Sequence, residues 1–313
     1  MKRVLITGGS GLLGSAVAMQ AVRDYETFLT YYTYPFRVPG AAGIIQADLA
    51  DRGVFRGLID GVQPEAIIHT AAFTNVDGCE VDRAQAERSN VVAVQLIAEE
   101  VAKIGARLIF ISTDYVFDGK KSYYTEEDAV NPLSYYAETK VRAEEIIRST
   151  CQSYCIVRTS LYGWNAQDKL SFSEWVIAGV SAGKKTPLFI DQYYSPILTN
   201  NLADALLELA AGRYTGTLHV TGAQRCSRFE VAECICDVFS LDKTCLSPVS
   251  RTSFRGPAAR PADSSLSVSK ARLILKTPLP DLQESITEMK RLQDEGYPAL
   301  VKSYCIQEGI VQQ

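Results

Sequence analysis

A tyrosine and a lysine stand four residues apart at Tyr136 and Lys140, in the sequence Tyr-Ala-Glu-Thr-Lys. On a helix, residues at this spacing lie one turn apart on the same face. The lysine ammonium would then stabilise the phenolate and lower the pKa of the tyrosine from about 10. Such a tyrosine donates a proton to a carbonyl oxygen as a hydride reaches the carbon. The same spacing pairs Tyr135 with Thr139, so Tyr136 is the expected proton donor.

A polar cluster of Ser112, Thr113 and Asp114 directly follows an apolar run at residues 108–111. A continuous apolar run of this kind indicates a strand that is buried on both faces of a parallel sheet. Active sites of open α/β sheets lie at the carboxyl ends of such strands. We therefore expect Thr113, or Ser112 beside it, to hydrogen-bond the carbonyl of a substrate. The structural alternative for Thr113 is a turn or helix-capping residue.

A glycine-rich segment, TGGSGLLG at residues 7–14, lies between the first expected strand and the first expected helix. Glycines at this spacing allow a tight turn and a close approach of the backbone to a pyrophosphate at the helix N-terminus. We therefore predict a dinucleotide site here, with a purely structural glycine turn as the alternative. The residues expected to contact the cofactor are Gly8, Gly11, Leu12 and Leu13.

The stretch after the second expected strand bears on the choice of cofactor. NAD-binding sites usually carry a carboxylate about twenty residues beyond the glycines, but residues 27–47 contain no Asp or Glu. Arg37 lies in this stretch and would pair with a ribose 2′-phosphate. NADPH is therefore the expected cofactor, with NADH as the alternative. The other interpretation of Arg37 is a solvent-exposed loop residue.

Four further residues are expected at the cofactor because each follows an expected strand. Asp48, with Leu49 beside it, follows the segment 44–47, and its carboxylate would accept a hydrogen bond from the adenine amino group. Ala71 and Ala72 follow the next strand, where small side chains would let the backbone lie against the cofactor.

Short β-rich runs alternate with amphipathic helical runs through the N-terminal half. The alternation is typical of a Rossmann-type α/β fold with a doubly wound, mostly parallel sheet. The expected strands lie near residues 4–7, 27–32, 44–47, 66–69, 108–111 and 155–158. The expected helices lie near residues 11–23, 84–104 and 134–149.

The regular alternation weakens after Gly163, where prolines become frequent. We expect residues 1–163 to form a dinucleotide-binding domain, to which residues 198–222 return with one helix and one strand. Residues 164–197 and 223–313 are expected to form mainly a smaller substrate-binding lobe and a C-terminal helix with one apolar face.

Composition and charge argue against several other classes of protein. The 313 residues are 47% hydrophobic and 22% charged, as in ordinary globular domains. The net charge of −4 gives no reason to expect nucleic acid or an anionic membrane as a partner. The eight cysteines show no C-x-x-C spacing, and no metal site is expected. A strand near the N-terminus and the lack of a long apolar run make a cytoplasmic location the expectation.

Several stretches together resemble the dTDP-4-dehydrorhamnose reductase family, within the extended short-chain dehydrogenase/reductase superfamily. The specific signature is STDYVFDG at residues 112–119, whereas the glycine motif and the Y-x-x-x-K motif mark only the superfamily. The other similar stretches are residues 71–77, 158–160, 191–192 and 260–266, with Lys270. The resemblance implies hydride transfer from NADPH or NADH to C4 of a nucleotide-linked 4-keto-6-deoxyhexose.

The resemblance also implies roles for individual residues. The catalytic residues would be Thr113 with Ser112, Tyr136 and Lys140. Tyr136 and Lys140 would contact the nicotinamide ribose as well. The residues implied at the sugar are Thr74, Val76, Asp114, Val116 and Arg260. A nucleotide sugar is therefore the expected partner, and a homodimer is compatible with the sequence.

Two stretches depart from the family pattern near the expected substrate lobe. The segment RTSLYG at residues 158–163 lacks the aromatic residue that the family usually carries there, and Trp164 follows as a candidate substitute. The family's D-Q-x-G-x-P-T becomes DQYYSPI at residues 191–197, which loses the glycine and the threonine. Both departures leave the expected chemistry intact and bear on the identity of the sugar.

Two other functions are consistent with the same motifs. One is another nucleotide-sugar enzyme of the superfamily, an epimerase or a dehydratase. Dehydratases usually carry an acidic residue beside the strand-end threonine, as Asp114 stands here, whereas the D-Y-V-F-D-G continuation favours the reductase. The other is a non-catalytic NADP-binding regulatory subunit, because the β-subunit of methionine adenosyltransferase resembles the same family and shares its glycine and Y-x-x-x-K motifs.

Overall fold

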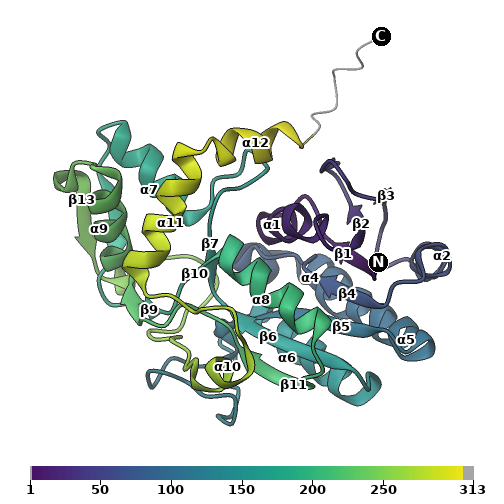
Figure 1. Cartoon of the computed structure of the whole chain (residues 1–313). Helices are drawn as coiled ribbons and strands as arrows, with labels where there is room; N and C mark the ends of the chain where they lie inside the picture. Colours follow the sequence, from purple (N-terminus) through teal and green to yellow (C-terminus); the bar gives the residue numbers. More distant parts are fainter. Residues whose placement is uncertain (1, 306–313) are drawn as a thin grey trace.

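The computed structural model describes residues 2–305, which build a seven-stranded parallel sheet with helices on both faces (Figure 1). The strands lie in the order β3-β2-β1-β4-β5-β6-β11. Their bounds are β1 Arg3–Thr7, β2 Glu26–Tyr31, β3 Gly43–Gln46, β4 Ala66–His69, β5 Arg107–Thr113, β6 Tyr154–Thr159 and β11 Gly216–His219. The order reverses beside β1, which is the doubly wound arrangement. The predicted Rossmann-type fold is therefore confirmed.

Two helical layers bury the two faces of the sheet. Helices α1 (Leu12–Ala21) and α8 (Thr199–Ala211) pack on one face. The helices of the other face are α2 (Arg52–Val62), α5 (Ala93–Ile104) and α6 (Tyr135–Thr150). Neighbouring residues of one strand enter different cores: Val4 packs with the α1 layer, and Leu5 packs with the α2 layer. The strands read as continuous apolar runs because both of their faces are buried.

A second group of elements lies beside the sheet (Figure 1). Its helices are α7 (Phe172–Ser181), α9 (Arg228–Phe239) and α11 (Leu282–Asp294), and its strands β8 (Thr186–Phe189) and β13 (Leu246–Val249) pair with each other. Between its parts the chain returns to the main sheet, where β11 pairs with β6. The remaining short elements are α3 Val76–Val81, α10 Ser269–Ile274, α12 Tyr297–Ser303, β7 Leu161–Tyr162, β9 Tyr193–Tyr194, β10 Ile197–Leu198 and β12 Cys226–Ser227.

The helix expected at residues 84–104 is divided into three parts. It consists of α4 (Arg83–Glu87), a wider π-helical turn (Arg88–Val92) and α5. Apolar spacing predicts the helix and its buried face, but it does not reveal an inserted residue. Within the wide turn, the buried Asn90 side chain accepts a hydrogen bond from the backbone N–H of Phe73 at 2.8 Å and donates to its carbonyl at 3.1 Å. The turn is thereby attached to the loop that follows β4.

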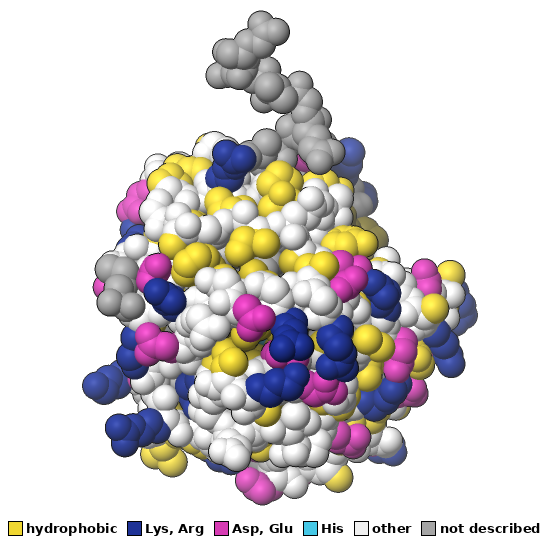
Figure 2. Space-filling view, turned by 90° about the vertical axis from the view of Figure 1, so that its right-hand side faces the viewer, with side chains coloured by type: hydrophobic (Ala, Val, Ile, Leu, Met, Phe, Trp, Pro, Cys, Tyr) yellow, Lys and Arg dark blue, Asp and Glu magenta, His cyan; other side chains and the backbone are white. Residues whose placement is uncertain are grey.

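One face of the molecule shows how the charges are distributed. Lys and Arg side chains are mixed with Asp and Glu there, and hydrophobic side chains gather in a band above them (Figure 2). Within residues 2–305, no three His, Cys, Asp or Glu side chains lie close enough together to hold a metal ion. No helix in the same part of the chain is both long and apolar enough to cross a membrane.

The glycine-rich turn between β1 and α1 is packed so closely that it has no room for side chains. A Cβ atom on Gly14 would lie 2.1 Å from the carbonyl oxygen of Gly8. A Cβ atom on Gly8 would lie 2.9 Å from the backbone of Ala71, and its φ of +70° also favours glycine. The turn therefore holds β1, α1 and the end of β4 in direct contact.

We predict that Gly14→Ala destabilises the protein, because the added methyl group overlaps a backbone oxygen. Overpacking of this kind costs about 1–3 kcal/mol, which would appear as a lower midpoint in urea unfolding. The matched control is Gly57→Ala in helix α2, where a Cβ atom meets nothing within 4 Å. That change should be neutral or stabilise the protein by up to about 1 kcal/mol. Equal midpoints for the two variants would contradict the close contact at Gly14.

Candidate active site

A cleft of about 620 Å³ runs along the carboxyl edge of the sheet. Such a position, outside the strand ends and beside the reversal of strand order, is where open α/β sheets bind ligands. The cleft brings together most of the residues singled out from the sequence. Those that line it are Gly8, Gly11, Leu12, Leu13, Ala71, Ala72, Thr74, Val76, Ser112, Thr113, Asp114, Tyr136 and Lys140.

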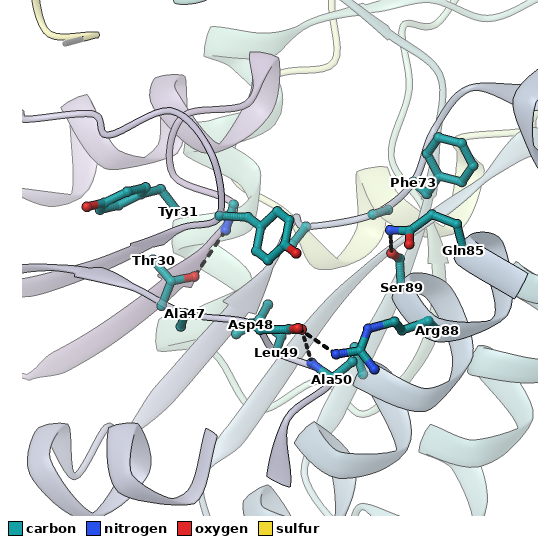
Figure 3. A pocket seen from close by; sticks show the side chains of 15 residues that line it. Thr30, Tyr31, Ala47, Asp48, Leu49, Ala50, Phe73, Gln85, Arg88 and Ser89 are labelled. Carbon is teal, nitrogen blue, oxygen red and sulfur yellow. Dashed lines mark hydrogen bonds and ion pairs between the residues drawn. The ribbon is translucent and has the colours of Figure 1, made fainter. Parts of the chain in front are cut away.

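A smaller pocket of about 230 Å³ is lined by Asp48 and Leu49 and shares Gly8 with the cleft (Figure 3). The Asp48 carboxylate accepts hydrogen bonds from the backbone of Ala50 at 3.0 Å and from the Arg88 guanidinium at 2.5 Å. Burial opposes ionisation of Asp48, but the hydrogen bonds from Arg88 and Ala50 and the charge of Arg88 together outweigh burial and lower the pKa of Asp48. The pocket therefore offers a charged carboxylate and an arginine beside the glycine turn.

Arg37 lines neither the cleft nor the smaller pocket. Its side chain is exposed, and its backbone N–H donates to the carbonyl of Tyr304 at 2.7 Å. Thr33 and Tyr34, earlier in the same loop, do line the cleft. The loop thus borders the cleft that the glycine-rich turn lines, while contact of Arg37 with a 2′-phosphate stays a prediction.

Helix α6 presents Tyr136 and Lys140 to the cleft. The helix begins at Ser134, whose hydroxyl accepts a hydrogen bond from the N–H of Ala137, so its first turn has a fixed direction. The Lys140 ammonium lies over the face of the Phe110 ring, 4.1 Å from the ring centre. Burial lowers the pKa of Lys140 to about 7, and Glu144 acts in the opposite direction.

The pKa of Tyr136 differs from the sequence-based expectation. Burial raises this pKa, and the Asp114 carboxylate raises it further, while a hydrogen bond with Thr113 acts in the opposite direction. The expectation that the pKa of Tyr136 lies below about 10 is therefore wrong, because burial and the Asp114 carboxylate both penalise the phenolate. The phenol is protonated at neutral pH, which is the form that donates a proton.

Thr113 lines the cleft, as expected for a residue that contacts the substrate, and it also caps a turn, which was the structural alternative. Its hydroxyl accepts a hydrogen bond from the N–H of Tyr115 at 3.2 Å and donates to Asp114 at 3.1 Å, so it caps the short turn that follows β5. Asp114 is buried and also accepts from Ser264 at 2.5 Å. Burial raises the pKa of Asp114 to about 6.

Ser112 lines the cleft, but its hydroxyl donates to Glu144 at 2.6 Å. Glu144 has no exposed surface and forms a two-point ion pair with Arg158, at 2.8 and 3.0 Å. It also accepts from Arg148 at 2.6 Å. Ser112 is therefore bound into a buried ionic network, and Thr113 is the better placed hydroxyl for a substrate.

Two of the residues that the family resemblance places at the sugar do not line the cleft. Val116 is fully buried in a small core with Phe117 and Leu266. Arg260 forms an ion pair with Asp77 at 2.6 Å. Both residues lie in segments that resemble the family. Val116 packs into a core and Arg260 pairs with Asp77, so neither side chain lines the cleft.

Trp164 does not replace the aromatic residue that the family carries near this position. The Trp164 indole N–H donates to the backbone of Met289 at 3.1 Å, and the ring is buried against Phe239. Leu161 lines the cleft instead. An aliphatic side chain therefore stands at this point of the cleft wall, next to the polar Thr159 and Ser160.

Sequence reasoning missed several residues that line the two hollows. The missed residues of the loop after β2 follow the end of a strand, and the strand-end rule could have identified them. The other missed residues lie in no recognisable motif. The missed residues include Tyr32, Tyr34, Tyr115, Gln167, Lys169 and Arg228 in the cleft, and Gln85, Arg88 and Ser89 in the smaller pocket.

We predict that Lys140→Met stabilises the protein at pH 7 and that the gain disappears as the pH rises toward 10.5. The folded state holds Lys140 at a pKa near 7, so between these pH values the unfolded chain binds more protons and the parent gains stability with pH. The gain at pH 7 should be on the order of 4 kcal/mol. Urea unfolding at pH 6 to 10 measures it, with the exposed Lys184→Met as control. A constant difference between parent and variant across this range would contradict the lowered pKa.

Comparisons with known proteins agree with this geometry. The model of the RmlD substrate binding domain family matches residues 1–294. A dTDP-4-dehydrorhamnose reductase of Mycobacterium tuberculosis is 32% identical, with 89% of each chain covered. A probable low-salt glycan biosynthesis reductase, Agl14, of Haloferax volcanii is 30% identical, with 91% of this chain and 96% of the relative covered.

Two further likenesses bear on function. Methionine adenosyltransferase 2 subunit beta of Danio rerio is 31% identical, with 87% of this chain and 85% of the relative covered. The crystal structure of dTDP-4-dehydrorhamnose reductase from Bacillus anthracis in complex with NADP has a TM-score of 0.83 and 28% identity, and covers 93% of this chain and 99% of that one. The chain therefore belongs to the dTDP-4-dehydrorhamnose reductase (RmlD) family of extended short-chain dehydrogenases/reductases.

Proposed function

We propose that the protein uses NADPH to reduce the C4 ketone of a nucleotide-linked 4-keto-6-deoxyhexose. The observation that carries the proposal is the convergence of Thr113, Tyr136 and Lys140 in one cleft with the glycine-rich turn. This arrangement puts a proton donor and a carbonyl-binding hydroxyl beside a dinucleotide site. The family relationship supports the nucleotide sugar as the class of substrate.

The glycine-rich turn fits a dinucleotide because Gly8 and Gly14 leave backbone where side chains would otherwise stand. The N-terminus of α1 would bind the pyrophosphate, and the smaller pocket with Asp48 would hold the adenosine. When bound, the nicotinamide supplies the hydride. The support for NADPH is the absence of a carboxylate at residues 27–47, the engagement of Asp48 with Arg88, and the NADP bound to the Bacillus anthracis relative.

The residues of the chain handle the carbonyl oxygen. With a substrate bound, the Thr113 hydroxyl would turn its one proton from Asp114 to this oxygen, and the Tyr136 phenol would transfer its proton to the oxygen as negative charge develops there. Lys140 stabilises the resulting phenolate electrostatically. The raised pKa of Tyr136 keeps its proton in place until the carbonyl oxygen becomes basic enough to take it.

The other enzyme class is less well supported by the site. A dehydratase requires an acidic residue that exchanges protons with the sugar. Asp114 stands in the right place in the sequence, but its two oxygens accept hydrogen bonds from Thr113 and Ser264. These bonds leave Asp114 better suited to holding Thr113 than to removing a proton.

A regulatory role remains the second candidate, because the Danio rerio relative is a subunit of methionine adenosyltransferase. Such a subunit would bind NADPH and the catalytic subunit of a methionine adenosyltransferase without reducing a ketone. Pull-down with a purified methionine adenosyltransferase catalytic subunit, alongside assays of NADPH oxidation, separates the two candidates. Stable capture of the methionine adenosyltransferase catalytic subunit without ketone reduction would support the regulatory role.

We predict that Tyr136→Phe lowers turnover of a dTDP-4-keto-6-deoxyhexose at least about 100-fold, because the change removes the proton donor. Cofactor affinity should stay close to that of the parent. The matched control is Tyr135→Phe, since Tyr135 does not line the cleft and its hydroxyl donates to Glu87 at 3.3 Å. The assay is NADPH oxidation followed by absorbance. Parent-like turnover in the Tyr136 variant would remove this residue from the mechanism.

We also predict that Arg37→Ala weakens NADPH binding and barely alters NADH binding. A lost charge-assisted hydrogen bond is worth about 1.5–3 kcal/mol, roughly ten- to over a hundredfold in affinity. Calorimetric titration of both cofactors measures this, with Arg56→Ala on the exposed surface of α2 as control. Equal weakening for the two cofactors would show that Arg37 does not recognise the phosphate. Tighter NADH binding by the parent would overturn the choice of NADPH.

A further inference from the structure

We propose that Arg228 binds the diphosphate that joins the nucleotide to the sugar. This inference rests on the proposed function, because it places the diphosphate of the same substrate in a part of the same cleft that has no other role assigned to it. Arg228 lines the cleft together with Thr113, Asp114 and Tyr115. It was not singled out by any sequence motif.

The fold brings Arg228 to this position from the second group of elements. It is the first residue of α9, and the preceding Ser227 caps the helix by accepting from the N–H of Glu230 at 3.1 Å. The backbone N–H of Arg228 donates to the carbonyl of Gln192 at 3.3 Å. The start of the helix is thus attached at two points, so the side chain leaves the backbone in a defined direction.

Aromatic rings hold the guanidinium of Arg228. It lies over the Tyr194 ring, 3.8 Å from its centre, and 5.0 Å from the centre of the Phe172 ring. The Tyr115 side chain is within hydrogen-bonding range as well. Aromatic faces stabilise a guanidinium but leave the N–H groups at its edge available to an anion.

Arg228 differs from its neighbours in forming no ion pair with a carboxylate, although the Asp114 carboxylate is near enough to favour its charge. Arg225 pairs with Asp263 at 2.6 Å, and Arg260 pairs with Asp77 at 2.6 Å. None of the ion pairs formed within residues 2–305 includes Arg228. A half-buried guanidinium with no carboxylate within ion-pair distance is only partly compensated, and a ligand that brings an anion to it would compensate it further.

The chemistry of the substrate indicates which anion this is. In a nucleotide sugar the diphosphate is attached at C1, across the ring from the C4 ketone. With C4 held at Thr113 and Tyr136, the diphosphate lies one sugar ring away, in the same cleft. A planar guanidinium binds phosphate oxygens through two parallel hydrogen bonds, which an ammonium does not. Arg260, which the family resemblance placed at the substrate, already has Asp77 as its anion.

The test is a set of calorimetric titrations on protein saturated with NADP⁺, so that the adenosine pocket is occupied. The ligands are dTDP and UDP, and thymidine and uridine as nucleosides without phosphate. We expect the parent to bind at least one diphosphate more tightly than its nucleoside. Arg228→Gln should weaken that diphosphate roughly ten- to a hundredfold and leave the nucleoside unchanged. Arg228→Lys should fall between the two, since it keeps the charge without the planar fork.

The matched control is Arg225→Gln, because Arg225 is three residues away, pairs with Asp263 and does not line the cleft. Its diphosphate affinity should equal that of the parent. NADPH affinity, measured for every variant, shows whether the fold is intact. The proposal is overturned if the parent binds none of the nucleotides, if Arg228→Gln binds the diphosphate as the parent does, or if it weakens diphosphate and nucleoside equally.

The result can be separated from the fate of the reductase proposal. Binding of a nucleoside diphosphate through Arg228, without reduction of any 4-keto sugar, would support the diphosphate subsite and contradict the reductase. Ketone reduction by the parent, with unchanged diphosphate affinity in Arg228→Gln, would contradict the subsite and leave the reductase standing.

Discussion

Helix α6 carries Tyr136, Lys140 and Glu144 at four-residue intervals, so these side chains share the face that meets the sheet. The carboxylate of Glu144 is completely buried, where it accepts a hydrogen bond from Ser112 of β5 and pairs at two points with Arg158 of β6. Removing one partner of a buried pair typically costs about 3–5 kcal/mol. The helix and both strands are therefore held in one relative position. That position determines where the phenol of Tyr136 meets the end of β5.

Burial has a different consequence for each of the titratable groups above this network. It raises the pKa of Tyr136, so the phenol keeps its proton, and it lowers the pKa of Lys140 to about 7. It raises the pKa of Asp114 to about 6. Asp114 and Lys140, which ordinarily titrate far apart, thus both change charge within a narrow pH range near neutrality. Titratable groups in a cleft whose pKa values are strongly shifted by burial are typical of functional sites.

The fold and the place of the glycine-rich turn at the cleft were predictable because their signals are local. Continuous apolar runs identify buried strands, and the strand-end rule located Thr113. The pKa of Tyr136 was not predictable from its spacing to a lysine, since burial is a property of the whole fold. Val116 and Arg260 lie in the right segments, but their side chains face a core and Asp77 instead. Arg228 has no motif, because it enters the cleft from a helix far along the chain.

The central claim is that this cleft transfers a hydride from the nicotinamide to C4 of the sugar while the chain supplies a proton to the oxygen. NADPH deuterated at both C4 positions of the nicotinamide, incubated with a dTDP-4-keto-6-deoxyhexose in ordinary water, tests it directly. Mass spectrometry and NMR of the product locate the label. The account predicts one deuterium on C4 of the sugar and none elsewhere. A reduced sugar without deuterium, or with deuterium on C3 or C5, would contradict it.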